Sequence, residues 1–271
     1  MARCLLESYR LGPLLLRNRV VMAPITTQYA DERGRVTEQL RAHYEIRAEG
    51  GAGLIVVEAS YVLPVGQAFA NQLGVYDDSL IPGLKELAAA IRRHGCVAAI
   101  QLHHGGRMAK SGLSGLQPVA PSAVADPRGE VPRALEDAEI QSTIRAFADA
   151  ARRALEAGFD AVEIHGAHAY LIDQFISPAS NRRTDAFGGC LENRARFLLQ
   201  VLQAVQQATG PDFPVWVRMN GREYGVEGGT TLEDAVAVAR MVERAGAVAI
   251  HVSAYGPATP TNRTTARFRP A

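Results

Sequence analysis

Short apolar runs alternate with longer amphipathic segments along most of this 271-residue chain. Such runs are typical of strands in a parallel sheet buried on both faces, and the segments between them are typical of crossover helices. The pattern therefore predicts repeated strand–helix units and an α/β fold. Six strands are expected, at Arg19–Ile25, Gly53–Ser60, Val97–His103, Ala161–His165, Val215–Asn220 and Val248–Ser253.

The segments between these strands carry apolar residues at helical spacing. The clearest predicts a helix over Asp137–Ala157, and a second is expected from about Leu80 to His94. Each is followed by a glycine, which commonly ends a helix. Thr231 is placed to cap a third helix, because its hydroxyl can accept a hydrogen bond from a backbone N–H of the first turn.

A weak internal repeat supports equivalent units. A helix end, a glycine and a strand occur in this order twice, because Glu156–Gly158 precedes Val162–His165 and Arg244–Gly246 precedes Val248–His251. Equivalent strand–helix units in one sheet favour a TIM-type (β/α)8 barrel, a single domain of about 250 residues.

A doubly wound nucleotide-binding fold is the alternative architecture. Its phosphate-binding turn needs three spaced glycines directly after a strand. Here Gly50, Gly51 and Gly53 precede a strand and do not complete that pattern, so the barrel is preferred. The first 18 residues are expected to form a hairpin that closes the bottom of the barrel. The Pro- and Gly-rich stretch Arg107–Glu136 is expected to be a long loop.

A complete barrel has eight strands, whereas the pattern provides six. The residues after Ser253 contain no apolar run and no helical period. We therefore expect a barrel that lacks its last two strand–helix units over residues 1–255, and an irregular tail over 256–271. Such a sheet would leave two edges open to pairing with another chain.

Composition excludes several classes of function. The formal net charge is +1, so no basic field indicates nucleic acid or a membrane as partner. No apolar run approaches the roughly 20 residues of a membrane span. Cys4, Cys96 and Cys190 are far apart, which fits a reducing compartment and gives no spacing for a metal site. Glu7 and Arg10 break the N-terminal apolar run, so no signal peptide is expected and the protein is predicted to be cytoplasmic.

The most informative motif is residues 164–197, IHGAHAYLIDQFISPASNRRTDAFGGCLENRARF. Three other motifs lie at the earlier strands: NRVVMAPITTQYADERG at the first, GLIVVEASYV at the second and AIQLHHGGR at the third. Through these motifs the chain resembles the old yellow enzyme family, the NADH:flavin oxidoreductases, over roughly residues 1–255. Within that family it is most similar to the branch that contains 2,4-dienoyl-CoA reductases and enoate reductases.

The resemblance implies FMN as cofactor, NADH or NADPH as reductant, and a small α,β-unsaturated carbonyl compound as substrate. It also implies that the flavin lies at the C-terminal ends of the barrel strands, where this architecture places its chemistry. The residues that match flavin-contacting positions of the family are Pro24, Thr26, Ala59, Gln101 and Arg218.

Three further matches suggest catalytic roles. In the family, the residues that match His165 and His168 hydrogen-bond the carbonyl oxygen of the substrate, and the residue that matches Tyr170 protonates its α-carbon. A metal site built from His103, His104, His165 and His168 is the alternative. That site has no carboxylate at a matching strand end, so the catalytic interpretation is favoured and no metal is expected.

Three of the predicted flavin contacts, Thr26, Gln101 and Arg218, also have a structural interpretation. The Thr26 hydroxyl could satisfy a nearby backbone group, and the Gln101 amide could be bonded within the barrel interior. Arg218 ends an apolar strand, where a charge is costly unless it is paired. It could therefore form an ion pair with Glu58 or Glu163, and this role is compatible with stabilising a reduced flavin.

Residues Ser180–Phe197 match the family closely, and we expect them to have a structural rather than a catalytic role. They are predicted to form a turn at Asp185 and Gly188–Gly189, followed by a helix. Cys190 stands where the family usually has serine. A serine could cap the helix, so the cysteine is expected to cost about 1 kcal/mol.

In the family, loops after strands seven and eight hold the FMN phosphate, and no segment of this sequence matches them. Three interpretations follow. The chain is an FMN-dependent ene-reductase, or a truncated relative that binds FMN weakly without turnover. Alternatively, it is a binding or assembly module whose open sheet edges pair with a second copy or with another partner.

Overall fold

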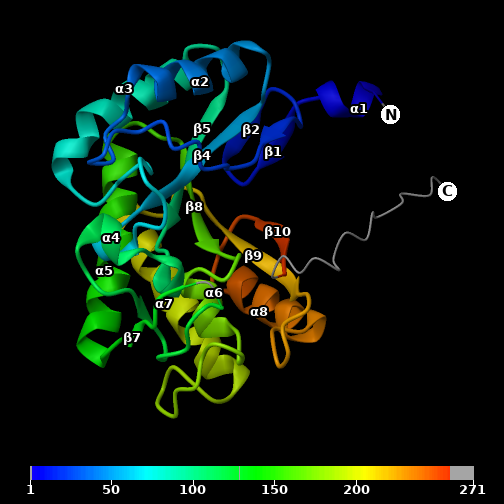
Figure 1. Cartoon of the computed structure of the whole chain (residues 1–271). Helices are drawn as coiled ribbons and strands as arrows, with labels where there is room; N and C mark the ends of the chain where they lie inside the picture. Colours follow the sequence, from blue (N-terminus) through cyan, green and yellow to red (C-terminus); the bar gives the residue numbers. More distant parts are fainter. Residues whose placement is uncertain (1, 128, 257–271) are drawn as a thin grey trace.

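A computed structural model describes residues 2–127 and 129–256 of the chain. Its centre is a parallel sheet in the order β10–β9–β8–β5–β4–β3, which curls into an open half-barrel (Figure 1). Its six strands are β3 (Val21–Met22), β4 (Leu54–Tyr61), β5 (Val97–His103), β8 (Ala161–Gly166), β9 (Val215–Glu223) and β10 (Ile250–Tyr255). All six predicted strands are therefore present, in parallel pairs as expected.

The first strand is much shorter than predicted. Only Val21 and Met22 pair with β4, whereas a strand over Arg19–Ile25 was expected. Pro24 follows at once, and because it has no N–H it cannot donate to the ladder. The rest of the predicted strand is a segment that leads to the C-terminal ends of the sheet strands. We call this end of the half-barrel its mouth.

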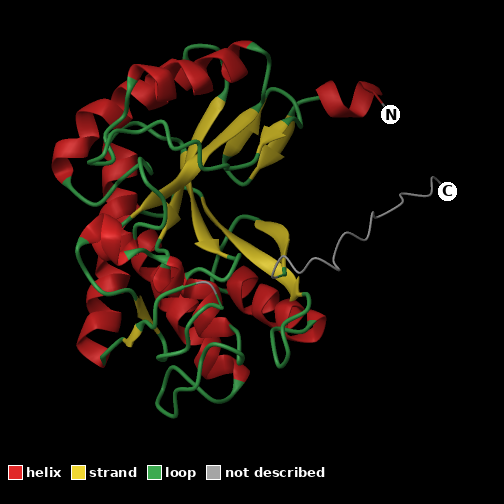
Figure 2. Cartoon of the chain, viewed as in Figure 1, coloured by secondary structure: helices red, strands yellow, loops and turns green. Residues whose placement is uncertain are grey.

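Five long helices pack on the outer face of the sheet, as Figure 2 shows. They are α2 (Glu38–Glu49), α3 (Ile81–Arg92), α5 (Asp137–Glu156), α7 (Leu191–Thr209) and α8 (Leu232–Arg244). Helices α3 and α5 confirm the two that periodicity predicted. Thr231 caps α8 as predicted, since its hydroxyl accepts from the backbone N–H of Asp234. The remaining helices are short: α1 (Ala2–Leu6), α4 (Ser111–Ser114), α6 (Leu171–Ile176) and the 3-10 turns η1 (Pro64–Gly66), η2 (Asp78–Leu80) and η3 (Gly106–Met108).

Cys190 is the residue before α7, and its side chain makes no capping hydrogen bond. The turn predicted before it is present, because the Gly188 N–H donates to the carbonyl of Asp185. Replacing Cys190 by serine is expected to raise the free energy of unfolding by about 0.5–1 kcal/mol, because the serine hydroxyl can accept from an N–H in the first helical turn. Urea denaturation would measure this gain, and Cys190→Ala is the control. An equal gain in both variants would contradict the capping explanation.

The predicted N-terminal hairpin is formed by β1 (Tyr9–Leu11) and β2 (Leu14–Leu16), which pair antiparallel. Its Leu16 side chain is buried against the inner face of the sheet. That cluster consists of Leu16, Leu54, Val56, Ala99, Ala161 and Trp216. The hairpin therefore closes the bottom of the half-barrel, as expected.

The stretch Arg107–Glu136 is more ordered than the expected loop. It begins in η3, continues through α4, and contains two short strands that pair in parallel, β6 (Val119–Ala120) and β7 (Arg133–Ala134). The Arg183 guanidinium donates to the carbonyls of Pro121 and Leu135, which ties the stretch to the segment before α7. Two-residue strands give no periodic signal, which explains why the pattern did not predict them.

Strand β4 contains a β-bulge, because its register against β5 shifts between Val57 and Ala59. A bulge turns one side chain away from the face it would otherwise occupy. The Glu58 carboxylate therefore contacts the outer helix α2, where its Oε2 accepts from Tyr44 Oη at 3.2 Å. The same oxygen accepts from the N–H and the hydroxyl of Thr27, at 3.1 and 2.5 Å.

Within the described part of the chain, β3 and β10 each have a neighbouring strand on one side only. The half-barrel therefore has two open edges. A barrel without its last two units stays a prediction, and the predicted tail over 256–271 lies outside the described residues except for Gly256. No described helix combines the length and the apolar character needed to cross a membrane.

Candidate active site

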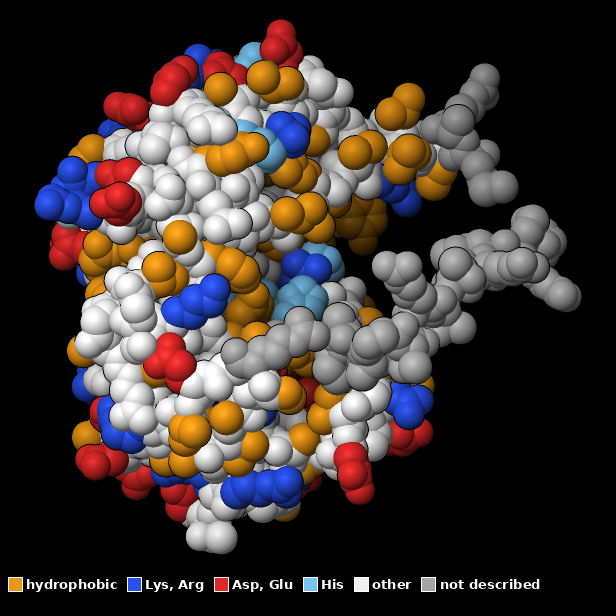
Figure 3. Space-filling view, in the orientation of Figure 1, with side chains coloured by type: hydrophobic (Ala, Val, Ile, Leu, Met, Phe, Trp, Pro, Cys, Tyr) orange, Lys and Arg blue, Asp and Glu red, His pale blue; other side chains and the backbone are white. Residues whose placement is uncertain are grey.

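The inner face of the half-barrel becomes polar toward the C-terminal ends of its strands. The apolar cluster around Leu16 and Trp216 forms the floor of the half-barrel. The next layer toward the mouth contains Gln101 and Glu163, which are register partners on β5 and β8. His165 and Arg218, partners on β8 and β9, form the next layer, because inward side chains of a strand are two residues apart. Figure 3 shows His and basic side chains where the surface is hollowed between the upper and lower parts of the molecule.

His165, His168 and Tyr170 lie together at the end of β8. The ring centroids of His165 and His168 are 5.1 Å apart, and those of His165 and Tyr170 are 5.0 Å apart. His103 on β5 joins them, with its ring centroid 4.3 Å from that of Tyr170. The structure thus brings the three predicted catalytic side chains into one cluster, and their roles remain predictions.

The hydrogen bonds of this cluster determine which atoms are available to a substrate. His165 Nδ1 accepts from the backbone N–H of Ala167 at 3.3 Å, which leaves the proton on Nε2. His168 Nε2 lies 2.6 Å from Ser253 Oγ on β10. Tyr170 Oη has no hydrogen-bond partner among the residues described. A carbonyl oxygen could therefore bind His165 directly, but at His168 it would have to replace Ser253.

Burial keeps these groups uncharged at neutral pH. It is the main cause that holds the pKa of His165 well below its usual value, and His103 is the next. Burial also lowers the pKa of His168 to about 4 and raises that of Tyr170 to about 12. Two neutral imidazoles and a phenol that keeps its proton are suited to donating hydrogen bonds and a proton.

The turn between β8 and Tyr170 has a strained backbone. His168 and Ala169 have φ values of 61° and 57°, in the left-handed region that side chains disfavour. Two buried groups hold it: Asp173 Oδ2 accepts from the Ala169 N–H at 2.7 Å, and Asn220 Oδ1 accepts from the His168 N–H at 3.3 Å. Asn220 Nδ2 also donates to Asp173 Oδ2 at 2.7 Å, so the two form one clamp.

Removing half of this clamp should destabilise the fold. Asn220→Ala is expected to lower the free energy of unfolding by about 2–3 kcal/mol, because the buried Asp173 loses a donor and the His168 N–H loses its acceptor. Chemical denaturation would measure the loss. The control is Asn193→Ala, since the Asn193 side chain accepts from Arg196 on the half-buried side of α7 and has no other hydrogen bond to a described residue. Equal effects of the two substitutions would show that the clamp carries no special stability.

Gln101 and Ala59 lie side by side on the inner face, as register partners across the bulge in β4. Gln101 Nε2 donates to Glu163 Oε1 at 2.6 Å, so one side of its amide is bonded within the barrel. This observation agrees with the structural interpretation of Gln101 without excluding a flavin contact, because the amide carbonyl remains as an acceptor.

Arg218 does not form the predicted ion pair with Glu58 or Glu163. Glu58 binds Thr27 and Tyr44, and Glu163 pairs with His251 at 2.8 Å. The bulge in β4 turns Glu58 to the outer face, and both oxygens of Glu163 are already bonded, Oε1 to Gln101 and Oε2 to Trp216 and His251. Within the described residues, the Arg218 side chain makes only two hydrogen bonds, each of 3.4 Å, from Nη1 to the Pro24 carbonyl and from Nη2 to Ser253 Oγ.

The mouth of the half-barrel therefore has unused donors. Arg218 Nε is buried and unpartnered among the described residues, and burial lowers the pKa of its guanidinium. The Thr26 hydroxyl likewise makes no hydrogen bond there, so its structural interpretation receives no support. The half-buried guanidinium of Arg218, the amide of Gln101 and the hydroxyl of Thr26 fit the alternating carbonyl and N–H groups at the edge of a flavin ring.

The four histidines do not make a metal site in the described part of the chain, where no group of three or more His, Cys, Asp or Glu is arranged to hold an ion. His104 Nδ1 accepts from the backbone N–H of Gly106. His168 is engaged by Ser253, and the rings of His103 and His165 are 5.5 Å apart. These contacts leave the histidines as hydrogen-bonding and packing groups.

Sequence reasoning missed several residues of the site. His251 and Ser253 on β10, and Asn220 and Asp173 of the clamp, were not singled out. The internal repeat contained the signal for His251, because it stands in the second copy where His165 stands in the first. Their strands confirm the relation, since both His165 and His251 are register partners of Arg218.

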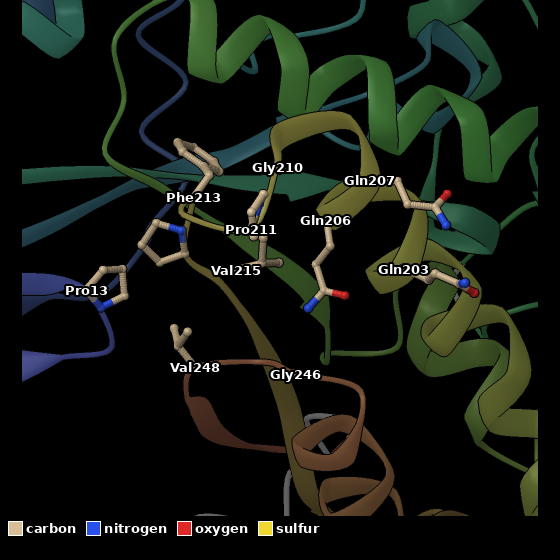
Figure 4. A pocket seen from close by; sticks show the side chains of 11 residues that line it. Pro13, Gln203, Gln206, Gln207, Gly210, Pro211, Phe213, Val215, Gly246 and Val248 are labelled. Carbon is tan, nitrogen blue, oxygen red and sulfur yellow. The ribbon is translucent and has the colours of Figure 1, made fainter.

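A separate pocket of about 390 Å³ lies at the opposite end of the strands (Figure 4). It is bounded by Pro13 of the hairpin, by Gln206 and Phe213 around the end of α7, and by Val248 just before β10. In barrels of this type the N-terminal ends of the strands serve stability and the C-terminal ends carry the chemistry. We therefore place the candidate site in the mouth.

Comparison with known proteins identifies the family. The model of the NADH:flavin oxidoreductase / NADH oxidase family matches residues 5–267. The chain belongs to this family. The family member "NADH oxidase" of Thermoanaerobacter brockii is 46% identical over 248 residues, which cover 90% of this chain and 38% of that protein. The "NADPH dehydrogenase" of Halalkalibacterium halodurans is 43% identical over 247 residues, which cover 91% of this chain and 71% of that protein.

Solved structures give the same family. A 2-naphthoyl-CoA reductase complex superposes with a TM-score of 0.92 at 32% identity, over 95% of this chain and 41% of that chain. Morphinone reductase superposes with a TM-score of 0.84 at 34% identity, over 92% of this chain and 71% of that chain. The old yellow enzyme-like family and the barrel type predicted from the sequence are thereby confirmed, the structure of this chain being a partial barrel. The predicted class of enzyme, an NAD(P)H-linked flavin oxidoreductase, is the class of these relatives.

Proposed function

We propose that this chain binds FMN in the mouth of the half-barrel and reduces activated alkenes, namely α,β-unsaturated carbonyl compounds, with NADH or NADPH as reductant. The observation that carries the proposal is the convergence of two neutral histidines and a tyrosine without a hydrogen-bond partner among the described residues, beside a half-buried arginine with spare donors. Membership of a flavin oxidoreductase family supports the cofactor, and relatives named for NADH and NADPH support the reductant.

The cofactor would be held by residues that are now incompletely bonded. Arg218 would donate to a carbonyl or an anionic nitrogen of the ring, and its positive charge would favour the reduced, negatively charged flavin. Gln101 and the Thr26 hydroxyl would complete the polar edge, while Pro24 and Ala59 would provide apolar contact. Gln101 and Ala59 lie in the C-terminal halves of β5 and β4, Pro24 and Thr26 follow β3, and Arg218 lies in the middle of β9.

The chemistry that FMN supplies when bound is hydride transfer, first from NADH or NADPH and then to the β-carbon of the alkene. His165 would donate a hydrogen bond from Nε2 to the substrate carbonyl, and His168 would donate a second once it leaves Ser253. Two such donors stabilise the negative charge that develops on the carbonyl oxygen. Tyr170 Oη would then transfer its proton to the α-carbon as a general acid.

Thioesters of coenzyme A are the substrate class that we propose within this reaction. The 2-naphthoyl-CoA reductase complex matches 95% of this chain with a TM-score of 0.92, which supports a place near the 2,4-dienoyl-CoA reductase branch. A thioester carbonyl conjugated with an alkene meets the chemical requirement of the site, because its oxygen can accept from both histidines.

The first test is the visible absorbance of the purified protein before and after FMN is added and the sample is desalted. Retained flavin is expected in the wild type and is expected to be lost in Arg218→Ala and in Gln101→Ala. Arg222→Ala is the matched control, because Arg222 lies on the same strand with its side chain exposed. A wild type that stays colourless would refute the proposal. Oxidation of NADH and NADPH in the presence of a 2,4-dienoyl-CoA or 2-cyclohexenone then tests turnover and substrate class.

The second candidate function is a binding or assembly module. The observation in its favour is the pair of open sheet edges, where Val21 on β3 is 48% exposed and Val252 on β10 is 67% exposed. Unpaired strand edges are templates for pairing with a second copy of the chain or with another protein. Light scattering during gel filtration tests this function, and a monomer that retains FMN and turns over would contradict it.

We also propose a cytoplasmic location. All three cysteines are free, and Cys4 and Cys190 are exposed. Exposed thiols persist in reducing compartments and tend to oxidise elsewhere. Fractionation of the native host with an antibody against the chain would test the location.

A further inference from the structure

Glu163 is the centre of a buried polar network that connects three other strands. Its side chain is fully buried on β8. Oε1 accepts from Gln101 Nε2 on β5 at 2.6 Å, and Oε2 accepts from Trp216 Nε1 on β9 at 2.7 Å. Oε2 also lies 2.8 Å from His251 Nδ1 on β10. Networks of this kind are costly when partly satisfied and rigid when complete.

The Glu163 carboxylate fixes the orientation of the Gln101 side-chain amide. A carboxylate oxygen accepts hydrogen bonds and offers none, so only the NH2 group of the amide can face it at 2.6 Å. The reversed amide would place two oxygens in contact without a hydrogen between them. The amide carbonyl of Gln101 is therefore fixed on the side away from Glu163.

The same carboxylate selects a tautomer of His251. The contact is made by Nδ1, so Nδ1 carries the proton and Nε2 faces away from Glu163. His251 is the register partner of Arg218, whose guanidinium has spare donors. Glu163 thus acts on two groups that border the predicted flavin position without lying at that position itself.

Trp216 supports the Glu163 side chain from the apolar side of the network. Its side chain belongs to the apolar floor, packed with Leu16 of the hairpin and Val56 of β4. Its indole N–H holds Oε2 of Glu163 in place, which leaves Oε1 directed at Gln101. The floor of the half-barrel therefore supports Glu163, whereas the direction of Gln101 follows from the carboxylate itself, because either of its oxygens can only accept.

We propose that Glu163 is a positioning residue, which sets the donor and acceptor direction of Gln101 and the tautomer of His251 for the polar edge of FMN. The inference rests on the proposed function, because it requires FMN in the mouth. Glu163 itself touches neither cofactor nor substrate in this assignment. Its effect on binding is transmitted through Gln101 and His251.

The test compares FMN dissociation constants, measured by quenching of flavin fluorescence, in the wild type and two variants. Glu163→Gln keeps the size of the side chain but can present either an oxygen or an NH2 group to Gln101, so affinity should fall about tenfold or more. Trp216→Phe removes one hydrogen bond from the same network but leaves the carboxylate facing Gln101, so affinity should change less than about threefold. Equal losses in both variants would overturn the inference.

A double-mutant cycle separates positioning from general damage. In a Gln101→Ala background, Glu163→Gln should lower FMN affinity by a smaller factor than in the wild-type background, because only the effect through His251 remains. A loss as large as in the wild-type background would show a merely structural role. If the wild type binds no FMN, the proposed function fails, and this outcome is distinct from failure of the inference alone.

A measurement on the wild type covers the case in which Glu163→Gln does not fold. Nitrogen-15 NMR of labelled histidine reports which ring nitrogen carries a proton. We expect His251 to be protonated at Nδ1, and the assignment can be made with a His251→Gln sample. An Nε2–H tautomer with bare Nδ1 would overturn the inference.

Discussion

Replacing Tyr170 by phenylalanine is expected to slow the reduction of an activated alkene by about 10²–10⁴-fold, because the α-carbon loses its proton donor. The rate at which NADPH is consumed in the absence of alkene should stay at the wild-type value, since that step needs no proton from Tyr170. The ring packs against His103 and His165, and phenylalanine keeps these contacts. A selective loss in one half-reaction is therefore the distinctive result.

Stopped-flow absorbance of the flavin band measures both half-reactions in one preparation. Tyr224→Phe is the control, because Tyr224 is 53% exposed on the segment after β9. Since burial raises the pKa of Tyr170 to about 12, the phenol keeps its proton over the usual assay range, and the alkene step should show no loss up to about pH 10. Equal slowing of both half-reactions by Tyr170→Phe would contradict the general-acid role.

The second large effect is on stability in acid. Burial lowers the pKa of His103 to about 3 and that of His104 to about 4, and it holds the pKa of His165 well below the ordinary 6.5. Groups whose pKa is depressed on folding contribute stability that is fully present above pH 6.5 and is lost as the pH falls toward the folded-state values. At pH 5 each fully buried histidine should lower the free energy of unfolding by about 2 kcal/mol relative to its value above pH 6.5.

The combined loss from His103, His104 and His165 is comparable with the whole free energy of unfolding of a typical domain, about 5–15 kcal/mol. Two buried carboxyl groups oppose it, because burial raises the pKa of Glu58 and places that of Asp173 well above its usual value. Their contributions grow as the pH falls through those raised values. The histidines are more numerous, so we expect the chain to lose most of its stability between about pH 6.5 and pH 4.5.

His103→Leu tests the cause of this acid sensitivity. Both ring nitrogens of His103 are buried without a partner among the described residues, so leucine should be tolerated. Urea denaturation at pH 7.5 and pH 5 should show that the variant loses about 2 kcal/mol less than the wild type between the two pH values. His43→Leu is the control, because His43 is only partly buried and its pKa is lowered less by burial. Identical pH dependence in the wild type and His103→Leu would refute the explanation.

Periodicity predicted the elements that are long and buried. Strands β4 and β5 are buried along nearly their whole length and appear in the sequence as continuous apolar runs. The amphipathic helix α5 begins at Asp137, where its acidic first turn is visible in the sequence. The short strands β3, β6 and β7 could not be found in this way, because two residues contain no period.

The candidate site was predicted from motifs, and its supporting residues were not. Tyr170, His165 and Arg218 belong to recognisable segments, and the fold does bring them together. The clamp made by Asp173 and Asn220 spans 47 residues of sequence, and the contact of His168 with Ser253 spans 85. Such pairs depend on which strands become neighbours and in which register, and neither is encoded in local spacing.

Through the bulge at Glu58, hydrogen bonds connect the outer helix α2 with the segment at the mouth that contains Thr27. Tyr44 lies on α2, behind the sheet, and its hydroxyl is bonded to both the backbone and the carboxylate of Glu58. Glu58 in turn holds Thr27, the residue next to Thr26. Directed evolution of such a chain can therefore tune the mouth through substitutions at Tyr44, a fully buried position behind the sheet that a search confined to residues lining the mouth would leave out.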